Sequence, residues 1–213
     1  MIHFVGAGAG APDLITLRGK KFLEEADVII YAGSLVNPQL LDYKKEGCRV
    51  YNSAIREQMD VLDEKGIGYD YCPGVSSFCG AASALNLEYT LPEVSQSVVI
   101  TRMAGRTPVP EKESIESFAA HQATMVVFLS TGMLEELSRR LIAGGYQADT
   151  PAAIVYKATW EDEKACVCTV GTLAETAKRE NITKTALMII GDIVTHSHYD
   201  RSKLYHPEFT TEF

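Results

Sequence analysis

Small residues near the start of the chain form the first pattern that could bind a ligand. In "HFVGAGAGAPDLITLRG", Gly6, Gly8 and Gly10 alternate with alanines directly after a short apolar run. With Ala11 in the last place, they fit the G-x-G-x-x-G/A pattern that holds a dinucleotide pyrophosphate at a helix N-terminus. The same glycines also fit a plain, tight strand-to-helix turn.

Two features count against the dinucleotide interpretation, and with it against a nucleotide-dependent dehydrogenase. The pattern needs a carboxylate about 20 positions further on, at the end of the next strand, to bind the ribose. Here the run "DVIIYAGS" ends without a carboxylate, because Asp27 lies at its start. Pro12-Asp13 also interrupts the direct entry into a helix that the phosphate cradle uses.

The cysteines and histidines form no pattern that is typical of a metal or redox site. None of the five cysteines makes a C-x-x-C pair. Cys166 and Cys168 alternate along an expected strand, so they share one face, where we expect half-buried thiols. His196 and His198 lie near a polar stretch without a third ligand nearby, so we expect no metal. We find no Ser-His-Asp or Cys-His set.

Composition restricts the class of protein. Hydrophobic residues make up 46% and charged residues 23%, as in an ordinary globular protein. The net charge of -8 argues against nucleic acid or an anionic membrane as the main partner. The sequence has no apolar run near the roughly 20 residues of a membrane helix, and no secretory leader pattern at its start. We expect a cytoplasmic protein.

The elements that must position the glycines alternate between strand and helix. Residues 1–94 show expected strands at "MIHFVGAG", "DVIIYAG", "CRVYN" and "YDYCPG". Between them we expect amphipathic helices at "LITLRGKKFLEEA" and "IREQMDVLDEKG" and a short helix at "NPQLLDYKKEG". Such alternation predicts an α/β domain with a mostly parallel sheet. "SSFCGAASALNLEY" reads as a further helix, rich in small residues.

Residues 95–213 form a second predicted α/β domain with a polar tail. Strands are expected at "SVVITRM", "TMVVFLS", "AAIVYKA", "KACVCTV" and "ALMIIGDIV", with helices at 134–144 and 173–180. The link in "YKATWEDEKACVCTV" is too short for a helical crossover, so its two strands should be antiparallel. The second sheet is therefore predicted to be mixed.

Six segments in order give the chain a resemblance to a known family. They are "VGAGAGAPDLITLRG", "ADVIIYAGSLV", "CPGVSSFCGAASAL", "ITRMAGRTPVPE", "VYKATWEDEK" and "YDRSKLY". Together they resemble the tetrapyrrole (corrin/porphyrin) methyltransferases, and most closely those that methylate carbon 11 of precorrin-4 or cobalt-precorrin-4 in cobalamin biosynthesis. The resemblance implies two α/β domains with a cleft between them, S-adenosylmethionine as methyl donor with S-adenosylhomocysteine as product, and a homodimer.

The resemblance also implies site residues, position by position. Matches to donor contacts are Ser76, Ser77, Leu129, Ala158, Thr185 and Ala186. Taken alone, the two serines would read as a helix cap, and Leu129 and Ala158 as core residues. The glycine turn, Gly8, Ala9 and Gly10, would line the place of the macrocycle and let backbone approach closely, without holding a pyrophosphate. Methyl transfer requires placement and dehydration rather than a protein nucleophile, so no catalytic residue is assigned.

The acceptor of such an enzyme carries many carboxylates, which an acidic chain must meet with a local cluster of cations. The basic residues in the matching motifs are Arg102, Arg106, Lys157, Arg201 and Lys203, and Arg18 could join them. Arginine binds carboxylates with two parallel hydrogen bonds. Pairing with neighbouring Glu111, Glu161 or Asp200 is an equally good account of any single one.

The chain departs from the family pattern after its third strand. Family members have a helix, a fourth strand and a donor-binding Gly-Asp-Pro loop there, whereas nothing of that kind lies between Tyr51 and Ile55. The missing piece would be about the 30 residues of a βαβ unit. An engineered deletion, a natural inactive variant and a mobile segment omitted from the sequence as written would each explain it, and we favour the last. The reason is that a real loss of an interior strand from a parallel sheet should expose apolar surface and unpaired backbone.

The departure leaves two further interpretations open. One is a non-catalytic relative that still binds tetrapyrrole, and the other is a methylase of a different ring position.

Overall fold

The computed structural model describes residues 1–33, 35–52 and 56–195. His196, His198, Arg201 and Lys203 lie outside these ranges. The chain divides into two compact units, Met1–Gly80 with Lys157–Glu163, and Ala81–Tyr156 with Lys164–Phe213. The domain boundary expected between residues 94 and 95 is not the division of these units, and it stays a prediction about domain organisation.

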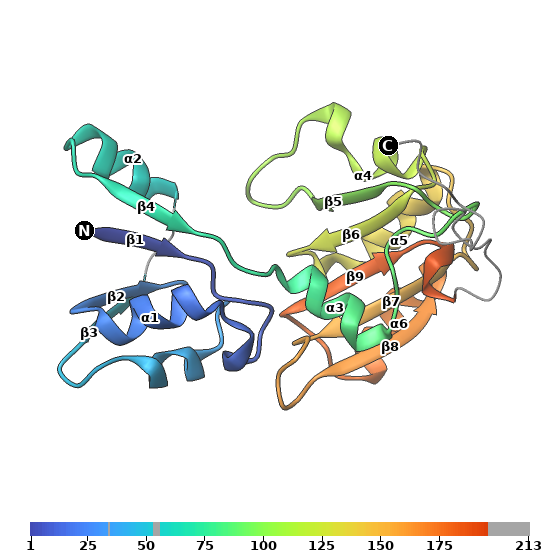
Figure 1. The fold of residues 1–213 in the computed structure, drawn as a ribbon. Helices are drawn as coiled ribbons and strands as arrows, with labels where there is room; N and C mark the ends of the chain where they lie inside the picture. The colour runs from blue at the N-terminus through green and yellow to red at the C-terminus, as the bar shows by residue number, and fades with distance from the viewer. Residues whose placement is uncertain (34, 53–55, 196–213) are drawn as a thin grey trace, which may run out of the picture. The chain divides into compact units, whose positions relative to one another are not determined.

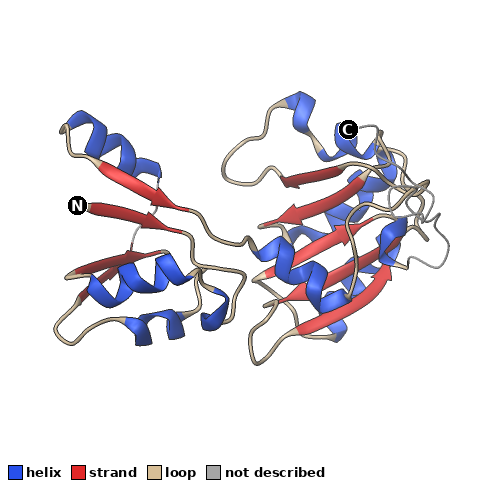
Figure 2. Ribbon diagram, in the orientation of Figure 1, coloured by secondary structure: helices blue, strands red, loops and turns tan. Residues whose placement is uncertain are grey.

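The first unit is built from short parallel strands and the helices between them (Figures 1 and 2). Its strands are β1 (Ile2–Val5), β2 (Val28–Tyr31), β3 (Arg49–Asn52) and β4 (Tyr69–Cys72). Its helices are α1 (Leu17–Glu25), α2 (Arg56–Glu64) and the start of α3 (Ser77–Leu85), with 3-10 turns η1 (Pro12–Leu14) and η2 (Pro38–Tyr43). The stretch "NPQLLDYKKEG", expected as a short helix, is thus a 3-10 helix.

Helix α1 packs on one face of β1 because its sequence leaves room there. Thr16 caps the helix by accepting a hydrogen bond from the Gly19 amide at 3.1 Å. A Cβ on Gly19 would lie 2.9 Å from a methyl of Val5, so glycine permits the close approach. The ring of His3 stacks on Phe22 with centroids 3.9 Å apart. His3 and Val5 therefore face α1.

The strands of the first unit form two separate pairs. β1 pairs with β4 and β2 pairs with β3, both parallel as predicted, and no described ladder joins β1 to β2. Apolar strand residues are exposed, among them Ile30 at 51% and Tyr51 at 53%. The loss of an interior strand from this unit stays a prediction.

The second unit contains one mixed five-stranded sheet in the order β5-β6-β9-β7-β8. The strands are β5 (Val98–Arg102), β6 (Thr124–Phe128), β7 (Pro151–Tyr156), β8 (Lys164–Thr169) and β9 (Ala186–Ile190). β5 and β6 are parallel, whereas β9 is antiparallel to both β6 and β7. The predicted antiparallel pairing of β7 with β8 is confirmed.

A continuous apolar core covers one face of this sheet. The helices are α4 (Ile115–Ala119), α5 (Leu134–Ala143) and α6 (Leu173–Arg179), with 3-10 turns η3 (Glu111–Glu113), η4 (Thr131–Met133), η5 (Val170–Thr172) and η6 (Asp192–Val194). Leu137 and Leu141 of α5 are fully buried beside Met125 and Ile154 of the sheet. No helix in the described ranges has both the length and the apolar character that a membrane crossing requires.

Candidate functional site

Strand directions bring several of the predicted site residues to one edge of the five-stranded sheet. β5, β6 and β7 run the same way and end there, while β8 and β9 begin there. Arg102 is paired with Phe128, and Tyr156 with Ala186, so these positions mark the edge. Arg102, Leu129, Lys157, Thr185 and Ala186 all lie at or next to these strand ends.

The backbone at these strand ends is strained. Among the described non-glycine residues, eight have a positive φ, and four of them are Leu129 (52°), Lys157 (46°), Thr159 (67°) and Thr185 (57°). For bulky or β-branched side chains this left-handed conformation is costly. Such strain persists where the surrounding structure imposes it, and it concentrates at functional sites. Leu129 is in addition 66% exposed, which no packing role explains.

Buried Ser130 holds the strained turn in place. Its hydroxyl accepts a hydrogen bond from the Met103 amide at 2.9 Å and donates one to the Phe128 carbonyl at 2.7 Å. It therefore ties the end of β5 to the end of β6. Thr131 follows, and its hydroxyl donates to the Ala186 carbonyl at 3.4 Å. Sequence analysis did not single out Ser130 or Thr131, although the polar pair "ST" directly after the apolar run "MVVFL" could have indicated them.

Arg102 and Arg106 have different surroundings. The Arg102 guanidinium donates to the carbonyls of Met103 (3.1 Å), Thr107 (3.1 Å) and Pro108 (3.0 Å), which closes the loop after β5. Its donors therefore serve the protein itself, and direct binding of an acceptor carboxylate by Arg102 stays a prediction. Arg106 lies exposed within the loop so closed, and it makes no hydrogen bond or ion pair among the described residues.

The glycine turn in the first unit brings backbone segments together. A Cβ on Gly10 (φ 146°) would lie 2.2 Å from the Ala158 carbonyl oxygen, and one on Gly6 would lie 2.5 Å from the Gly74 nitrogen. The Ala11 amide donates to the Thr159 hydroxyl at 2.8 Å. The glycines are therefore required for close contact between main chains.

In loop Lys157–Glu163 of the first unit, charged side chains bind partners within the same loop. Lys157 donates to Asp162 at 2.6 Å, and its ammonium lies 5.0 Å from the centroid of the Trp160 ring. The Thr159 amide donates to Glu163. Ala158 is buried, and its carbonyl faces Gly10. The expected role of Lys157 toward an acceptor stays a prediction, because a carboxylate already binds this lysine.

Ser76 and Ser77 lie at the carboxyl end of the β1–β4 pair, where the glycine turn also begins. Val5 is paired with Cys72, and the Gly6 amide donates to the Cys72 carbonyl at 2.9 Å. Ser76 is exposed and immediately precedes α3, and its carbonyl accepts from the Cys79 amide at 3.0 Å. The first unit thus gathers Gly8, Ala9, Gly10, Ser76, Ser77, Lys157 and Ala158. The second unit gathers Arg102, Arg106, Leu129, Thr185 and Ala186.

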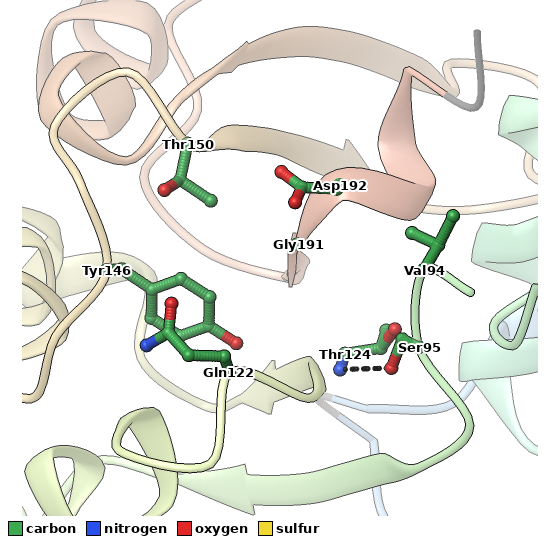
Figure 3. Close-up of a pocket in the computed structure, with 8 residues that line it drawn as sticks. All are labelled: Val94, Ser95, Gln122, Thr124, Tyr146, Thr150, Gly191 and Asp192. Atoms are coloured by element: carbon green, nitrogen blue, oxygen red, sulfur yellow. Dashed lines mark hydrogen bonds between the residues drawn. The ribbon is translucent and has the colours of Figure 1, made fainter. Parts of the chain in front are cut away.

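A small polar pocket lies at the opposite edge of the five-stranded sheet (Figure 3). It is lined by Val94, Ser95, Gln122, Thr124, Tyr146, Thr150, Gly191 and Asp192. Tyr146 donates to the Ala123 carbonyl, and the Thr124 amide donates to Ser95 at 3.0 Å. Burial raises the pKa of Tyr146 to about 12, with a smaller contribution from Asp192. None of the predicted site residues lines this pocket, and its buried polar groups already have partners.

The two thiols of β8 have raised pKa values. Burial raises the pKa of Cys168 to about 11 and raises that of Cys166, and both pack against the core. A thiol with a raised pKa is a poor nucleophile at neutral pH. No three or more histidine, cysteine, aspartate or glutamate side chains in the described ranges are placed to hold a metal ion.

The groups at the strand ends suit a ligand that is apolar over much of its surface. Exposed Leu129 offers an apolar side chain, and the turns at Leu129 and Thr185 place backbone groups at the sheet edge. The hydroxyls of Ser76 and Ser77 and the backbone after β4 add polar groups in the first unit. The two units carry these groups separately, and binding of S-adenosylmethionine by them stays a prediction.

Comparison with known proteins gives a consistent result. The family model described as tetrapyrrole (corrin/porphyrin) methylases matches residues 1–56 and 49–174. The cobalt-precorrin-4 C(11)-methyltransferase of Methanocaldococcus jannaschii is 45% identical, over 100% of this chain and 95% of the relative. The X-ray structure of cobalt precorrin-4 methyltransferase, a cobalamin biosynthetic enzyme, is 35% identical with a TM-score of 0.87, covering 91% of this chain and 95% of that one.

A more distant structure shares the fold. The uroporphyrin-III C-methyl transferase of Thermus thermophilus, complexed with S-adenosylhomocysteine, is 21% identical with a TM-score of 0.72, over 91% of this chain and 98% of that one.

The same comparisons show that this chain is shorter than the relative it matches. The alignment with the Methanocaldococcus relative runs over 246 positions, whereas this chain has 213 residues, so at least 33 positions have no counterpart here. The family model matches in two pieces that meet at residues 49–56. A missing segment between Tyr51 and Ile55 stays a prediction.

Proposed function

The chain belongs to the tetrapyrrole (corrin/porphyrin) methylases, and on that premise we propose that it transfers the methyl group of S-adenosylmethionine to carbon 11 of precorrin-4 or cobalt-precorrin-4. The reaction belongs to cobalamin biosynthesis. The relatives at 45% and 36% identity that are named for the cobalt form span the whole chain. The observation within the structure that supports the proposal is the strained backbone at Leu129 and Thr185, at one edge of the second sheet.

Methyl transfer requires the protein mainly to position the donor and the acceptor next to each other. S-adenosylmethionine supplies an activated methyl on a sulfonium, which an electron-rich ring carbon can displace in line. The residues that we assign to the donor are Ser76, Ser77, Leu129, Ala158, Thr185 and Ala186. Leu129 would exclude water beside the methyl, and the two serines would offer hydroxyl and backbone groups to the polar end of the donor.

Binding of the acceptor requires cations for its carboxylates and a main chain that can approach its ring closely. We assign Gly8, Ala9 and Gly10 to the ring, because their turn carries little side-chain bulk. Arg106 is the cation best placed to bind a carboxylate, because it is exposed and makes no ion pair among the described residues. Arg102 would act by holding the loop that presents Arg106, and Lys157 would reach a carboxylate by exchanging Asp162 for it.

The setting of the enzyme follows from charge and family. We infer a cytoplasmic homodimer whose partner is a small tetrapyrrole, with no nucleic-acid or membrane partner. The net charge of -8 supports the last point.

Calorimetric titration tests the proposal against the dehydrogenase alternative. We expect S-adenosylhomocysteine to bind with 1:1 stoichiometry and NAD to give no heat of binding. Binding of NAD in place of S-adenosylhomocysteine would overturn the proposal.

The absent segment favours one second candidate, a relative that binds tetrapyrrole without methylating it. Such a protein would bind the acceptor while showing no methyl transfer at any donor concentration. A measured transfer rate above that of the protein-free reaction would exclude it.

A further inference from the structure

Loop Lys157–Glu163 connects β7 to β8, yet it belongs to the first unit, together with the glycine turn. The residues that flank it, Tyr156 and Lys164, are register partners in the second unit. A hydrogen bond across 148 positions of sequence joins the loop to the turn, from the Ala11 amide to the Thr159 hydroxyl at 2.8 Å. Specific contacts therefore fix the loop against the turn.

Thr159 lies where the loop comes closest to the turn. A Cβ on Gly10 would lie 2.6 Å from the Thr159 hydroxyl oxygen and 2.7 Å from Cδ1 of Trp160, so the loop fits there because Gly10 has no side chain. A Cβ on buried Gly80 of α3 would lie 3.2 Å from the Ala9 methyl and 3.3 Å from the Thr159 methyl. Thr159 thus contacts the turn through its hydroxyl, and its methyl lies near α3.

The backbone of Thr159 is held in a conformation that threonine avoids. Its φ of 67° lies in the left-handed region, which is costly for a β-branched side chain. Its amide donates a charge-assisted hydrogen bond to the Glu163 carboxylate, and the Glu163 amide donates to the Trp160 carbonyl at 3.1 Å. Glycine or asparagine would adopt this backbone at a lower cost, which points to a use for the threonine side chain.

The turn at residues 8–11 consists of residue types that favour no single backbone conformation. Gly8 and Gly10 have φ of 80° and 146°, and glycine exchanges such values for others at little cost. The hydrogen bond at Ala11 and the close fit at Gly10 select one of these conformations. A site that is ordered before its ligand arrives loses less conformational entropy on binding. Thr159 can therefore strengthen binding at the turn without touching the ligand.

We propose that Thr159 is a positioning residue for the acceptor. Its hydroxyl fixes residues 8–11 in the conformation that receives the tetrapyrrole ring, and Glu163 keeps Thr159 in the conformation that this contact requires. The inference rests on the proposed function, because the glycine turn is assigned to the acceptor there. Its consequence is selective: loss of the Thr159 hydroxyl weakens binding of the acceptor and leaves binding of S-adenosylhomocysteine unchanged.

The fluorescence of Trp160 measures binding at the turn. Trp160 is the single tryptophan of the chain and lies beside Gly10, so a tetrapyrrole bound there should quench its emission by energy transfer. We expect Thr159→Val, which keeps the shape of the side chain, to raise the dissociation constant for cobalt-precorrin-4 about tenfold. Thr159→Ser, which keeps the hydroxyl, should restore that constant to within about twofold. Calorimetry should give the same dissociation constant for S-adenosylhomocysteine in all three proteins.

Thr150→Val is the matched control for Thr159→Val. The Thr150 hydroxyl likewise accepts a main-chain amide, from Gln147 at 3.0 Å, and it lies in the second unit at the small polar pocket. Its loss should lower the free energy of unfolding about as much as Thr159→Val does, with both dissociation constants unchanged. Equal weakening of both ligands by Thr159→Val, or no recovery in Thr159→Ser, would show a purely structural role and overturn the inference.

Glu163→Ala separates positioning from charge. The acceptor carries carboxylates, so removal of a negative charge from the loop should, by charge alone, strengthen its binding. Glu161→Ala removes an exposed carboxylate from the same loop and measures that effect. We expect Glu163→Ala to weaken acceptor binding about fivefold, and Glu161→Ala to leave it unchanged or slightly tighter. Tighter binding in both variants would contradict the role of Glu163.

The inference and the proposed function fail in different ways. If cobalt-precorrin-4 does not quench the unaltered chain although S-adenosylhomocysteine binds, the proposed acceptor is wrong and the inference falls with it. If quenching occurs with the same dissociation constant in Thr159→Val, the inference alone is wrong. Exchange of the Ala11 amide, followed by NMR without ligand, should be faster in Thr159→Val than in Thr159→Ser, and equal rates would count against the inference.

Discussion

Leu129 is both strained and exposed, a combination that stabilises nothing in the folded chain. Its φ of 52° is costly for a branched side chain, and its exposed side chain gains little from burial. Ser130 and Thr131 hold the turn by hydrogen bonds to the ends of three strands. A residue kept in this state is best explained by a contact with a ligand.

Replacing Leu129 should therefore separate stability from binding. We expect Leu129→Gly to leave the free energy of unfolding unchanged or to raise it by up to about 1 kcal/mol, because glycine adopts a positive φ without strain. The dissociation constant for S-adenosylhomocysteine should rise about tenfold. Urea unfolding and calorimetry measure the two quantities.

Glu93→Gly is the matched control for Leu129→Gly. Glu93 has a φ of 60° and is exposed, but it lies away from the strand ends of the site. The free energy of unfolding of Glu93→Gly should change in the same direction as that of Leu129→Gly. Its dissociation constant for S-adenosylhomocysteine should not change. A Leu129→Gly protein that binds as tightly as the unaltered chain would remove Leu129 from the donor site.

Gly10 tests the reason for the glycine turn. In Gly10→Ala the new methyl would meet the Ala158 carbonyl at 2.2 Å in a conformation with φ of 146°, so we expect unfolding to become easier. The loss should be about 2–4 kcal/mol in urea unfolding, from the steric clash and the backbone strain together. Gly66→Ala, with φ of 63° and nothing within 4 Å, should lose about 1 kcal/mol from strain alone. Equal losses would show that contact with Ala158 does not matter.

At the scale of the elements, the sequence pattern and the structure agree where burial decides the outcome. The runs "DVIIYAG" and "TMVVFLS" predicted strands, because parallel and central strands are apolar on both faces, and they contain β2 and β6. The short link between β7 and β8 required the antiparallel pair that is observed.

Other features of the site depend on tertiary contacts and could not be read from the chain. The positive φ at Leu129 and Thr185 has no local signature in those residue types. The capture of Arg102 by three carbonyls depends on the path of the loop that follows it, and the use of Ser130 depends on the pairing of β5 with β6. Resemblance pointed to Leu129 and Thr185, whereas periodicity would have placed Leu129 in the core.

Cys168 in strand β8 makes the stability of the fold depend on pH. Burial raises the pKa of Cys168 from 9.0 to about 11, so the folded chain keeps its proton where the unfolded chain loses it. The stability from this group is complete below pH 9 and is lost as the pH rises toward 11. Over that interval, the free energy of unfolding of Cys168→Ala should fall by about 1 kcal/mol less than that of the unaltered chain. This figure allows for screening of a half-buried thiol.

Urea unfolding at a series of pH values checks this effect. Cys48→Ala serves as the control, because Cys48 is not among the thiols that pack against the core. Identical pH profiles for Cys168→Ala and the unaltered chain would show that the environment of Cys168 does not hold its proton.

At the scale of the whole molecule, the main predicted departure from the family is the absence of a segment between Tyr51 and Ile55. An intact mass of 23.3 kDa, measured on protein isolated from its natural source, would establish that the chain lacks the segment. A larger mass would show that the natural chain carries the segment. If the chain lacks the segment, we expect weak binding of S-adenosylmethionine. Insertion of the unmatched segment of the Methanocaldococcus relative after Asn52 should strengthen it, and calorimetry on the chain with and without this insertion compares the two.

The most direct measurement follows a labelled methyl group from donor to acceptor. The chain, with and without the relative's segment inserted after Asn52, is incubated with cobalt-precorrin-4 and S-adenosylmethionine. The methyl group of the donor carries carbon-13, and the product is analysed by NMR. We predict label on carbon 11, with faster transfer in the form that contains the segment. Label on another ring carbon, or no transfer by either form while both bind S-adenosylhomocysteine, would contradict the assignment.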